Sequence, residues 1–468
     1  MVKTKARLTE GPIFFRLFLF SVPIMLSSLL QVAYNMIDSI IVGQFSGDEL
    51  ALAAIGSTGS ITALIVNLLM GIATGASVVI AQFYGAKDSE HVSRSVHTAM
   101  TFALITGVAF AAFAAIFSSP ILTAMNTKAE LFDRALLYLR IICIGIPATT
   151  IYNFGDATLR SVGDSKTPLY SLILSSIVHI ILSILFVAVF KMGISGVAIA
   201  TVISQYISAA FVVIILTLRR HESYAFSIKK MVLDSKILGR ILRFGFPTAL
   251  QSSFFSISGV LITVASNDLS SAALSARSIA GQVDNLVYAA MNSYTFSTMT
   301  FVAQNFGAKK EGRIKKTMLF SLIQVTIVGV GLGQLISLLS PYLVDVFMAS
   351  DLTNRAEVAE YAINLIQYFL TFYWLNGLMT TLTGILRGLG YPTAPTVISI
   401  IGVCGIRLIW IYFFYPMEMF HSLNGLYTSY LATWLFCVPA MAIALAIVWK
   451  RVKPQLAETK ETCEKQAV

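Results

Sequence analysis

A single carboxylate stands in an apolar stretch near the start of the chain. Residues 31–42 read QVAYNMIDSIIV, and Asp38 is the only charged residue among them. Gln31, Asn35 and Asp38 are spaced four and three residues apart, which places them on one face of a helix. Tyr34 lies close to the same stripe. A charge at bilayer depth costs at least about 2.5–3.5 kcal/mol, so we expect this face to point towards protein or water.

Such a carboxylate could bind the ion that drives a transport cycle. Desolvation favours the protonated form of a carboxyl group, so a buried acid can take up and release a proton near neutral pH. Once ionised, the same group can bind Na⁺ through its oxygens. The residues leave a structural role open as well, in which Asp38 caps a neighbouring helix or pairs with a buried base.

A second group of polar residues lies in later apolar runs. Asp284, Tyr288 and Met291 share a helix face at i, i+4 and i+7, and this combination suits a flat organic cation. Arg407 lies in the middle of another run. These four residues are candidates for a substrate cavity, although Asp284 and Arg407 could instead pair and hold their half of the protein together.

Three more polar residues complete the candidates. Asn153 and Asp156 lie near the end of an apolar run, where they could line the substrate cavity or sit at an interface between helices. His179 stands in the apolar run SSIVHIILSILF. Imidazole titrates near neutral pH, so His179 could share a proton with Asp38, or it could be a hydrogen-bonded filler of the core.

The sequence holds no reactive constellation typical of an enzyme. Of the five histidines, four lie in or near connections between apolar runs, without a paired acid at metal or acyl-transfer spacing. The HEXXH, GXSXG and P-loop motifs are absent. Three of the four cysteines, Cys143, Cys404 and Cys437, lie in apolar runs and are expected to be small core residues rather than metal ligands. We expect neither an enzyme nor a metal centre.

The composition indicates an integral membrane protein. The chain has 468 residues, of which 56% are hydrophobic and only 12% are charged, whereas soluble chains carry about 25% charged residues. The formal net charge is +10, and the basic residues cluster in the short breaks between apolar runs. This pattern indicates membrane topology rather than a nucleic-acid surface, so the expected partners are the lipid bilayer and small organic molecules.

The elements that must position these residues are transmembrane helices. Runs of this length can cross about 30 Å of hydrocarbon only as helices, and a β-barrel would instead show alternating segments of about 10 residues. We count twelve spans, at residues 14–42, 51–83, 95–117, 135–155, 168–190, 194–218, 240–265, 272–303, 317–340, 359–384, 394–416 and 424–449. Lysine and arginine gather at the N-terminus, in the breaks after even-numbered spans and in the C-terminal tail. Both termini are therefore expected in the cytoplasm, with the first span retained in the cell membrane rather than cleaved as a signal peptide.

The chain repeats itself once. IAQFYGAK (80–87) matches VAQNFGAK (302–309), LRSVGDSKTP (159–168) matches LRGLGYPTAP (386–395), and FSVPIMLSS (20–28) matches FGFPTALQS (244–252), in the same order and at nearly one spacing. An even number of spans in each half gives both halves the same orientation, so they are expected to be parallel repeats with a site between two lobes. The predicted parts are an N-terminus (1–13), a first lobe (14–218), a cytoplasmic linker (219–239), a second lobe (240–449) and a cytoplasmic tail (450–468). The acids are not repeated, because Asp38 matches Ile262 and Asp284 matches Thr62.

These motifs resemble a known family. Asn35 and Asp38 followed by Val42-Gly43, the repeated AQxxGAK, and LRxxGDxKTP are similar to the multidrug and toxic compound extrusion (MATE) family, over about residues 10–450. The resemblance implies a V-shaped pair of six-helix lobes, monomeric and without a cofactor. It also implies export of organic, often cationic, compounds by alternating access, in exchange for H⁺ or Na⁺.

The resemblance also bears on the coupling ion. The first helix of the family bends at a proline fifteen residues before its acid, and Pro23 stands at that distance from Asp38. Sodium-binding members add an Asn and an Asp on the fifth helix, where this sequence has His179 and Ser183. Because the second carboxylate is missing, H⁺ is the expected ion, with Gln31, Asn35, Asp38 and His179 as the coupling residues.

Other classes of membrane protein fit less well. A flippase for lipid-linked oligosaccharides shares this lobe architecture, but its cavity needs several cations, and Arg407 is the single mid-span base of this chain. A channel with a symmetric pore would be expected to have two similarly charged lobes, whereas the lobes of this chain differ in charge. An ATP-driven pump would need a nucleotide-binding domain, which this sequence lacks. A membrane-embedded enzyme is the remaining alternative. We therefore expect a secondary active multidrug antiporter.

Overall fold

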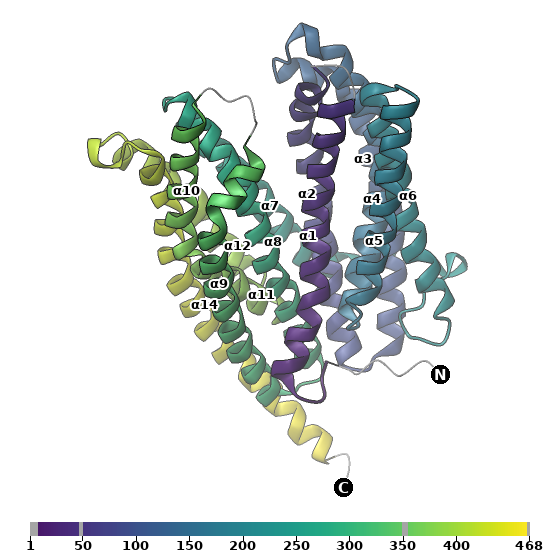
Figure 1. The fold of residues 1–468 in the computed structure, drawn as a ribbon. Coiled ribbons are helices and arrows are strands. Elements are labelled where there is room, and N and C mark those ends of the chain that lie inside the picture. The colour runs from purple at the N-terminus through teal and green to yellow at the C-terminus, as the bar shows by residue number, and fades with distance from the viewer. Residues whose placement is uncertain (1–7, 46–49, 349–353, 466–468) are drawn as a thin grey trace. The chain divides into compact units, whose positions relative to one another are not determined.

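The computed structural model describes residues 8–45, 50–348 and 354–465, and the elements within them are helices (Figure 1). The first half contains α1 (Ile13–Phe45), α2 (Ala51–Gly85), α3 (Ser89–Ala124), α4 (Ala129–Ser161), α5 (Lys166–Ile184) and α6 (Gly193–Leu218). The second half contains α7 (Ser235–Ala265), α8 (Ser271–Gly307), α9 (Glu311–Phe347), α10 (Arg355–Thr371), α11 (Tyr373–Gly388), α12 (Thr393–Ile400), α13 (Arg407–Ile409) and α14 (Leu423–Lys465). Three π-helical turns, Leu185–Val189, Ile401–Ile406 and Trp410–Phe414, extend α5 and join α12 to α13 and beyond.

Each of the twelve expected spans forms a helix or a series of consecutive helices. Within the described residues, ten helices are long and apolar enough to cross a membrane, and the pair α10 and α11, bent by 47°, makes an eleventh. The remaining expected span, 272–303, forms the 37-residue helix α8. Helix α8 does not meet the same hydropathy test, because it carries Arg277, Asp284 and many hydroxyl and amide side chains.

The described chain divides into two compact units. One unit, called unit 1 here, contains Leu26–Ala249, and the other, unit 2, contains Leu8–Met25 together with the residues from Leu250 onwards. Helices α1 and α7 therefore each contribute one half to each unit. Both carry an internal proline, Pro23 or Pro247, shortly before the division. A proline inside a helix removes a backbone hydrogen bond and permits a kink. The lobe boundaries drawn from the sequence stay a prediction.

The repeat in the sequence is also a repeat in backbone conformation. The two LRxxG turns place Gly163 and Gly390 at φ of 90° and 91°. The two GAK turns place Lys87 and Lys309 at φ of 61° and 55°. Left-handed backbone of this kind ends a helix, and glycine adopts it without steric cost. The paired motifs therefore encode the same helix ends in both halves.

Close helix contact in unit 1 depends on glycine. A Cβ atom added at Gly75 of α2 would collide with backbone atoms of α7 at Gly245 and Ile241. Gly71, one turn earlier, lies equally close to the backbone of Ala249. By contrast, Gly56 and Gly59 at the other end of α2 face open space. Small residues let helix backbones approach closely, as is common in membrane proteins.

The segment that precedes α1 is held by side chains of unit 2. The Arg313 guanidinium on α9 donates to three backbone carbonyl oxygens of this segment at 2.9–3.1 Å, those of Leu8, Glu10 and Gly11. Leu8 is buried. The start of α1 is therefore fixed to the first turn of α9 by charge-assisted hydrogen bonds.

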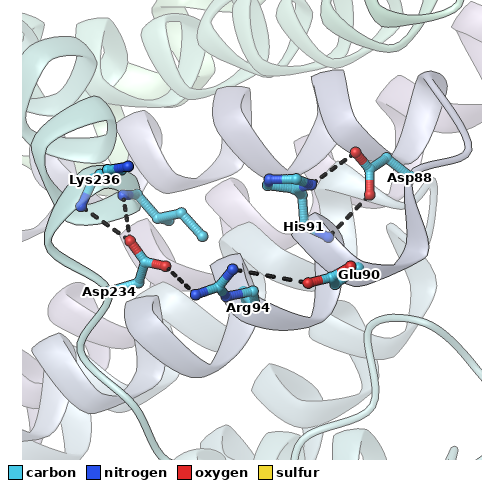
Figure 2. Close-up of polar contacts among 7 residues, drawn as sticks. Asp88, Glu90, His91, Arg94, Asp234 and Lys236 are labelled. Atoms are coloured by element: carbon cyan, nitrogen blue, oxygen red, sulfur yellow. Dashed lines mark hydrogen bonds and ion pairs between the residues drawn. The ribbon is translucent and has the colours of Figure 1, made fainter.

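The connection between the two halves, residues 219–234, is packed within unit 1. The backbone N–H of Ser227 donates to Nε2 of buried His97 at 3.1 Å. At the end of the connection, Asp234 forms an ion pair with Arg94 of α3 at 2.8 Å. Asp234 also accepts hydrogen bonds from the backbone N–H groups that begin α7, and Arg94 reaches Glu90 on its other side (Figure 2). This connection is thus held in place by contacts with α3.

Candidate functional site

The candidate ion site lies in unit 1, where α1, α5 and α6 meet. Asp38 of α1 and His179 of α5 are brought together, with 3.0 Å between Asp38 Oδ1 and His179 Nε2. The imidazole is fully buried, and the Asp38 side chain is 15% exposed. The predicted proximity of the two residues is therefore present in the fold, as are the helical positions of Gln31, Tyr34 and Asn35 in α1.

The hydrogen bonds around the imidazole define its tautomer. His179 Nε2 lies 3.1 Å from Ser183 Oγ and 3.4 Å from Thr201 Oγ1. The Thr201 hydroxyl already donates its proton to the carbonyl of Val197, so its oxygen can only accept from the imidazole. His179 Nδ1 is buried without a hydrogen-bond partner. The proton of a neutral imidazole thus belongs on Nε2, where the Thr201 hydroxyl oxygen can accept it.

Tyr34 fixes the plane of the imidazole. The two rings stack with their centroids 3.9 Å apart and their planes 22° apart. The Tyr34 hydroxyl lies 2.8 Å from Ser204 Oγ on α6. Because Ser204 donates its own proton to the carbonyl of Thr201, the Tyr34 hydroxyl must be the donor in this pair. The Tyr34 ring is thereby anchored to α5 by its face and to α6 by its hydroxyl.

Asp38 keeps one oxygen that the neighbouring groups do not satisfy. Oδ1 is close to Nε2 but has no hydrogen bond of acceptable geometry with any described residue. Leaving a buried carboxylate oxygen without a donor costs about 1–3 kcal/mol or more. Gln31 is exposed on the same helix. The side chain of Asn35 lies outside the described residues, so its predicted role stays a prediction.

The second-half candidates lie in unit 2. Asp284 Oδ1 accepts a hydrogen bond from the Tyr373 hydroxyl at 2.6 Å. Arg407 Nη1 donates to Ser258 Oγ of α7 at 2.9 Å. Asp284 and Arg407 are not an ion pair, since no nitrogen–oxygen distance of 4.0 Å or less joins them among the described residues. Each therefore has a different immediate partner.

The other predicted cavity residues fall in differing surroundings. Tyr288 is half-buried one turn from Asp284, whereas Met291 is fully buried in the hydrophobic core of unit 2. Asp156 forms an ion pair with Arg160 within α4, with 2.6 Å between Oδ1 and Nε. Asn153 is half-buried one turn earlier. Their assignment to a substrate cavity stays a prediction.

Several partners of these residues were not expected from the sequence. Thr201 and Ser204 are hydroxyl residues on one face of a mostly apolar helix, and that spacing is a signal the sequence did carry. Ser258 and Tyr373 resemble ordinary core residues in the sequence. Only the packing of distant helices identifies them as partners of Arg407 and Asp284.

The fold and these motifs can be compared with known proteins. The model of the MatE family matches residues 23–185 and 247–413, which is more than half of the chain. The chain belongs to the MatE family. The two matched segments correspond to the two halves of the repeat. The resemblance inferred from the motifs is therefore confirmed, and this MatE member is a multi-pass membrane transporter rather than an enzyme.

Individual relatives agree with this assignment. The chain is 30% identical over 396 residues to "Probable multidrug resistance protein YoeA" of Bacillus subtilis, covering 83% of this chain and 84% of that protein. It is 22% identical over 460 residues to "Multidrug export protein MepA" of Staphylococcus aureus, covering 97% and 98%. A solved structure described as "MATE in complex with MaL6" superposes with a TM-score of 0.86 at 21% identity, covering 96% and 98%. The all-helical, two-lobed fold predicted from the sequence is thus confirmed.

Proposed function

We propose that this protein exports organic, mainly cationic, compounds across the cell membrane in exchange for H⁺, by alternating access. Family membership and the multidrug resistance and export names of its relatives support the transport of drug-like molecules. The observation that carries the coupling step is the 3.0 Å contact between Asp38 Oδ1 and buried His179 Nε2, in which this carboxylate oxygen has no hydrogen-bond donor among the described residues. The lipid-linked oligosaccharide flippase has no comparable support.

Protonation of Asp38 is the step that links the ion to the cycle. A proton on the carboxyl group removes its charge and turns an acceptor into a donor. The contacts among Asp38, His179 and the hydroxyls of α6 must then rearrange, so the two protonation states favour different packings of α1 against α5 and α6. An ion can drive a conformational change only through such a difference in interaction free energy.

The ligands near Asp38 favour H⁺ over Na⁺ as the coupling ion. A hard cation such as Na⁺ prefers several oxygen ligands, and the group closest to Asp38 Oδ1 is an imidazole nitrogen. We also propose that both termini are cytoplasmic, because Lys and Arg gather in the connections on that side.

Transport in reconstituted vesicles tests this proposal. Purified protein in liposomes should move ethidium when a pH gradient alone is imposed, and replacing Na⁺ by choline on both sides should leave the rate unchanged. A Na⁺ gradient alone, at equal pH, should drive no transport. Transport that follows the Na⁺ gradient and ignores the pH gradient would overturn the coupling ion. Absence of ethidium movement under either gradient would overturn cation export.

A further inference from the structure

The connection between the two halves exposes a short basic and aliphatic stretch. Ile228–Lys230 form a 3₁₀ turn, and all three side chains are exposed, that of Ile228 by 74%. Val232 and Leu233, which follow the turn, are 42% and 45% exposed. The stretch 228–233, called the basic turn here, thus presents three exposed aliphatic side chains and two ammonium groups.

The opposite side of the connection is anchored in unit 1. Tyr224 and Phe226 are buried, and the ring of Phe226 lies 5.5 Å from the ring of His97 of α3, measured between centroids. The backbone N–H of Ser227 donates to His97 Nε2. The residue directly before the basic turn is therefore fixed to α3, so the basic turn extends from a packed base.

The contacts of the connection also indicate its depth in the bilayer. Ser227 is bonded to His97 on one side of the basic turn. On the other side, the backbone N–H of Asp234 donates to Thr98 Oγ1 at 3.2 Å. Arg94 is the last charged residue of α3, so His97 and Thr98 stand where the apolar run of this helix begins. Because a membrane helix enters the hydrocarbon where its charged residues end, the basic turn is expected at the boundary between lipid headgroups and hydrocarbon.

The surroundings of the basic turn are positively charged. Residues 219–243 contain seven basic residues and two acidic ones: Arg219, Arg220, Lys229, Lys230, Lys236, Arg240 and Arg243 against Glu222 and Asp234. Asp234 is already paired with Arg94 (Figure 2). Among the described residues, neither Lys229 nor Lys230 lies within 4.0 Å of a carboxylate oxygen. The two lysines therefore have no close counter-charge within the described part of the chain.

We propose that the basic turn is a lipid-binding surface, whose aliphatic side chains enter the edge of the hydrocarbon and whose lysines bind the phosphate groups of anionic lipids. A lysine can lay its methylene stem along an apolar surface while its ammonium group reaches the headgroups. Basic residues close to a membrane are attracted by the negative charge of its anionic lipids. This surface concerns how the chain is held in the bilayer, and it goes beyond the proposed export function.

A bilayer fits the basic turn better than a soluble ligand does. A bilayer offers hydrocarbon and phosphate at the same depth, so one surface satisfies Ile228, Val232 and Leu233 together with the two lysines. A free phosphate ion would leave these aliphatic side chains in water. A soluble protein partner would have to reach them at the level of the headgroups.

A fluorescent probe on the basic turn tests its depth. Ile228→Cys is labelled with the dye NBD in a Cys463→Ser background, since the other three cysteines are buried, and the full-length protein is placed in lipid nanodiscs. Lys87→Cys, labelled in the same way, is the control because Lys87 is exposed on the turn between α2 and α3. NBD emission moves to shorter wavelength when the dye leaves water, so the label at position 228 should emit at shorter wavelength than the label at position 87. Equal emission from both positions would overturn the proposal and point to a soluble partner instead.

The preference for an anionic headgroup is tested with the same label at position 228. The detergent-solubilised protein is titrated with short-chain phosphatidylglycerol, which is anionic, or with short-chain phosphatidylcholine, which is zwitterionic. We expect phosphatidylglycerol to bind at least about fivefold more tightly, because lysines at a membrane surface attract anionic lipids. Lys229→Gln combined with Lys230→Gln should remove this preference. Lys309→Gln combined with Lys316→Gln removes two exposed lysines elsewhere and should leave the preference unchanged.

Three results of this titration would contradict the proposal. They are equal binding of the two lipids, a preference that persists without Lys229 and Lys230, and an equal loss of preference in the control double variant. Inorganic phosphate should not change the fluorescence, and a response matching that of phosphatidylglycerol would indicate a free-anion site instead of a lipid surface. Because neither a transported substrate nor a gradient is used, the result is independent of the proposed export function.

Discussion

At the scale of residues, the meaning of Asp38 depends on what surrounds it. A carboxylate within a membrane helix can be a structural acid that is fully hydrogen-bonded, or a group that exchanges an ion. Among the described residues, Asp38 Oδ1 makes an ion-pair contact with a buried imidazole and no hydrogen bond, and that imidazole lies within hydrogen-bond distance of Ser183 and Thr201. The hydroxyls of Ser183 and Thr201 favour the tautomer with its proton on Nε2. The contact with Asp38 therefore does not use a hydrogen bond from the imidazole.

The role of His179 can be separated from that of Asp38. If the imidazole is a neutral donor, an amide that keeps an N–H near the Nε2 position should substitute for it. We expect His179→Gln to retain transport driven by a pH gradient within about threefold, and His179→Leu to reduce it by more than about tenfold. His221→Gln, at an exposed histidine, is the control. A loss in His179→Gln as large as that in His179→Leu would mean that the imidazole itself carries the coupling proton.

At the scale of elements, the sequence predicts where helices lie better than how they meet. Long apolar runs and short polar breaks identify every span, because burial in lipid leaves a helix as the only solution. The break between α10 and α11 was not expected, since both pieces read as one apolar run. Asp38 and His179 were identified as a pair from residue type and family resemblance. Thr201, Ser204 and Ser258 were missed, because a hydroxyl in an apolar helix gains its role only from a neighbour distant in sequence.

The packing of α2 against α7 provides a test at this scale. Gly75→Val would place side-chain atoms against the backbone of Gly245 and Ile241, which cannot move without displacing α7. We expect the free energy of unfolding to fall by about 1–3 kcal/mol, as measured by thermal unfolding of the purified protein. Gly59→Val on the same helix faces open space and should leave stability unchanged within about 0.5 kcal/mol. Equal melting temperatures for the two variants would refute the close packing.

The connection before α7 stabilises the fold by an amount that depends on pH, and the sign of this dependence follows from Asp234. The pKa of Asp234 is lowered because the backbone N–H of Ile237 donates to its carboxylate, with the N–H of Lys236 and the Arg94 guanidinium adding to the effect (Figure 2). A carboxyl group with a lowered folded-state pKa stabilises the fold above its unfolded value of about 3.9. That stabilisation is lost as the pH falls through the lower folded-state value.

The Asp234→Asn variant measures this contribution. Its melting temperature should lie below that of the wild type at every pH above about 5, and the difference should shrink as the pH falls below about 3.9. Glu90→Gln, at an exposed partner of the same arginine, should show little difference at either pH. A difference between Asp234→Asn and wild type that persists unchanged in acid would show that the charge of Asp234 is not its source.

At the scale of the whole molecule, the two halves share backbone features but not their charged residues. The helix ends at Gly163 and Gly390 have the same left-handed backbone. A proton site needs a group that titrates, and Asp38 of unit 1 matches Ile262 of unit 2. We therefore propose that unit 1 carries the ion coupling.

The central claim is that Asp38 carries the coupling proton, and one comparison tests it most directly. Ethidium transport into liposomes under an imposed pH gradient is measured for wild type, Asp38→Asn and Asp88→Asn, with equal amounts of reconstituted protein. Asp88 is a partly exposed carboxylate that caps α3 and pairs with His91, outside the proposed site. We predict that Asp38→Asn reduces the rate by more than about tenfold, because an amide cannot exchange a proton, and that Asp88→Asn stays within about twofold of wild type. Wild-type transport by Asp38→Asn under the pH gradient would contradict the account.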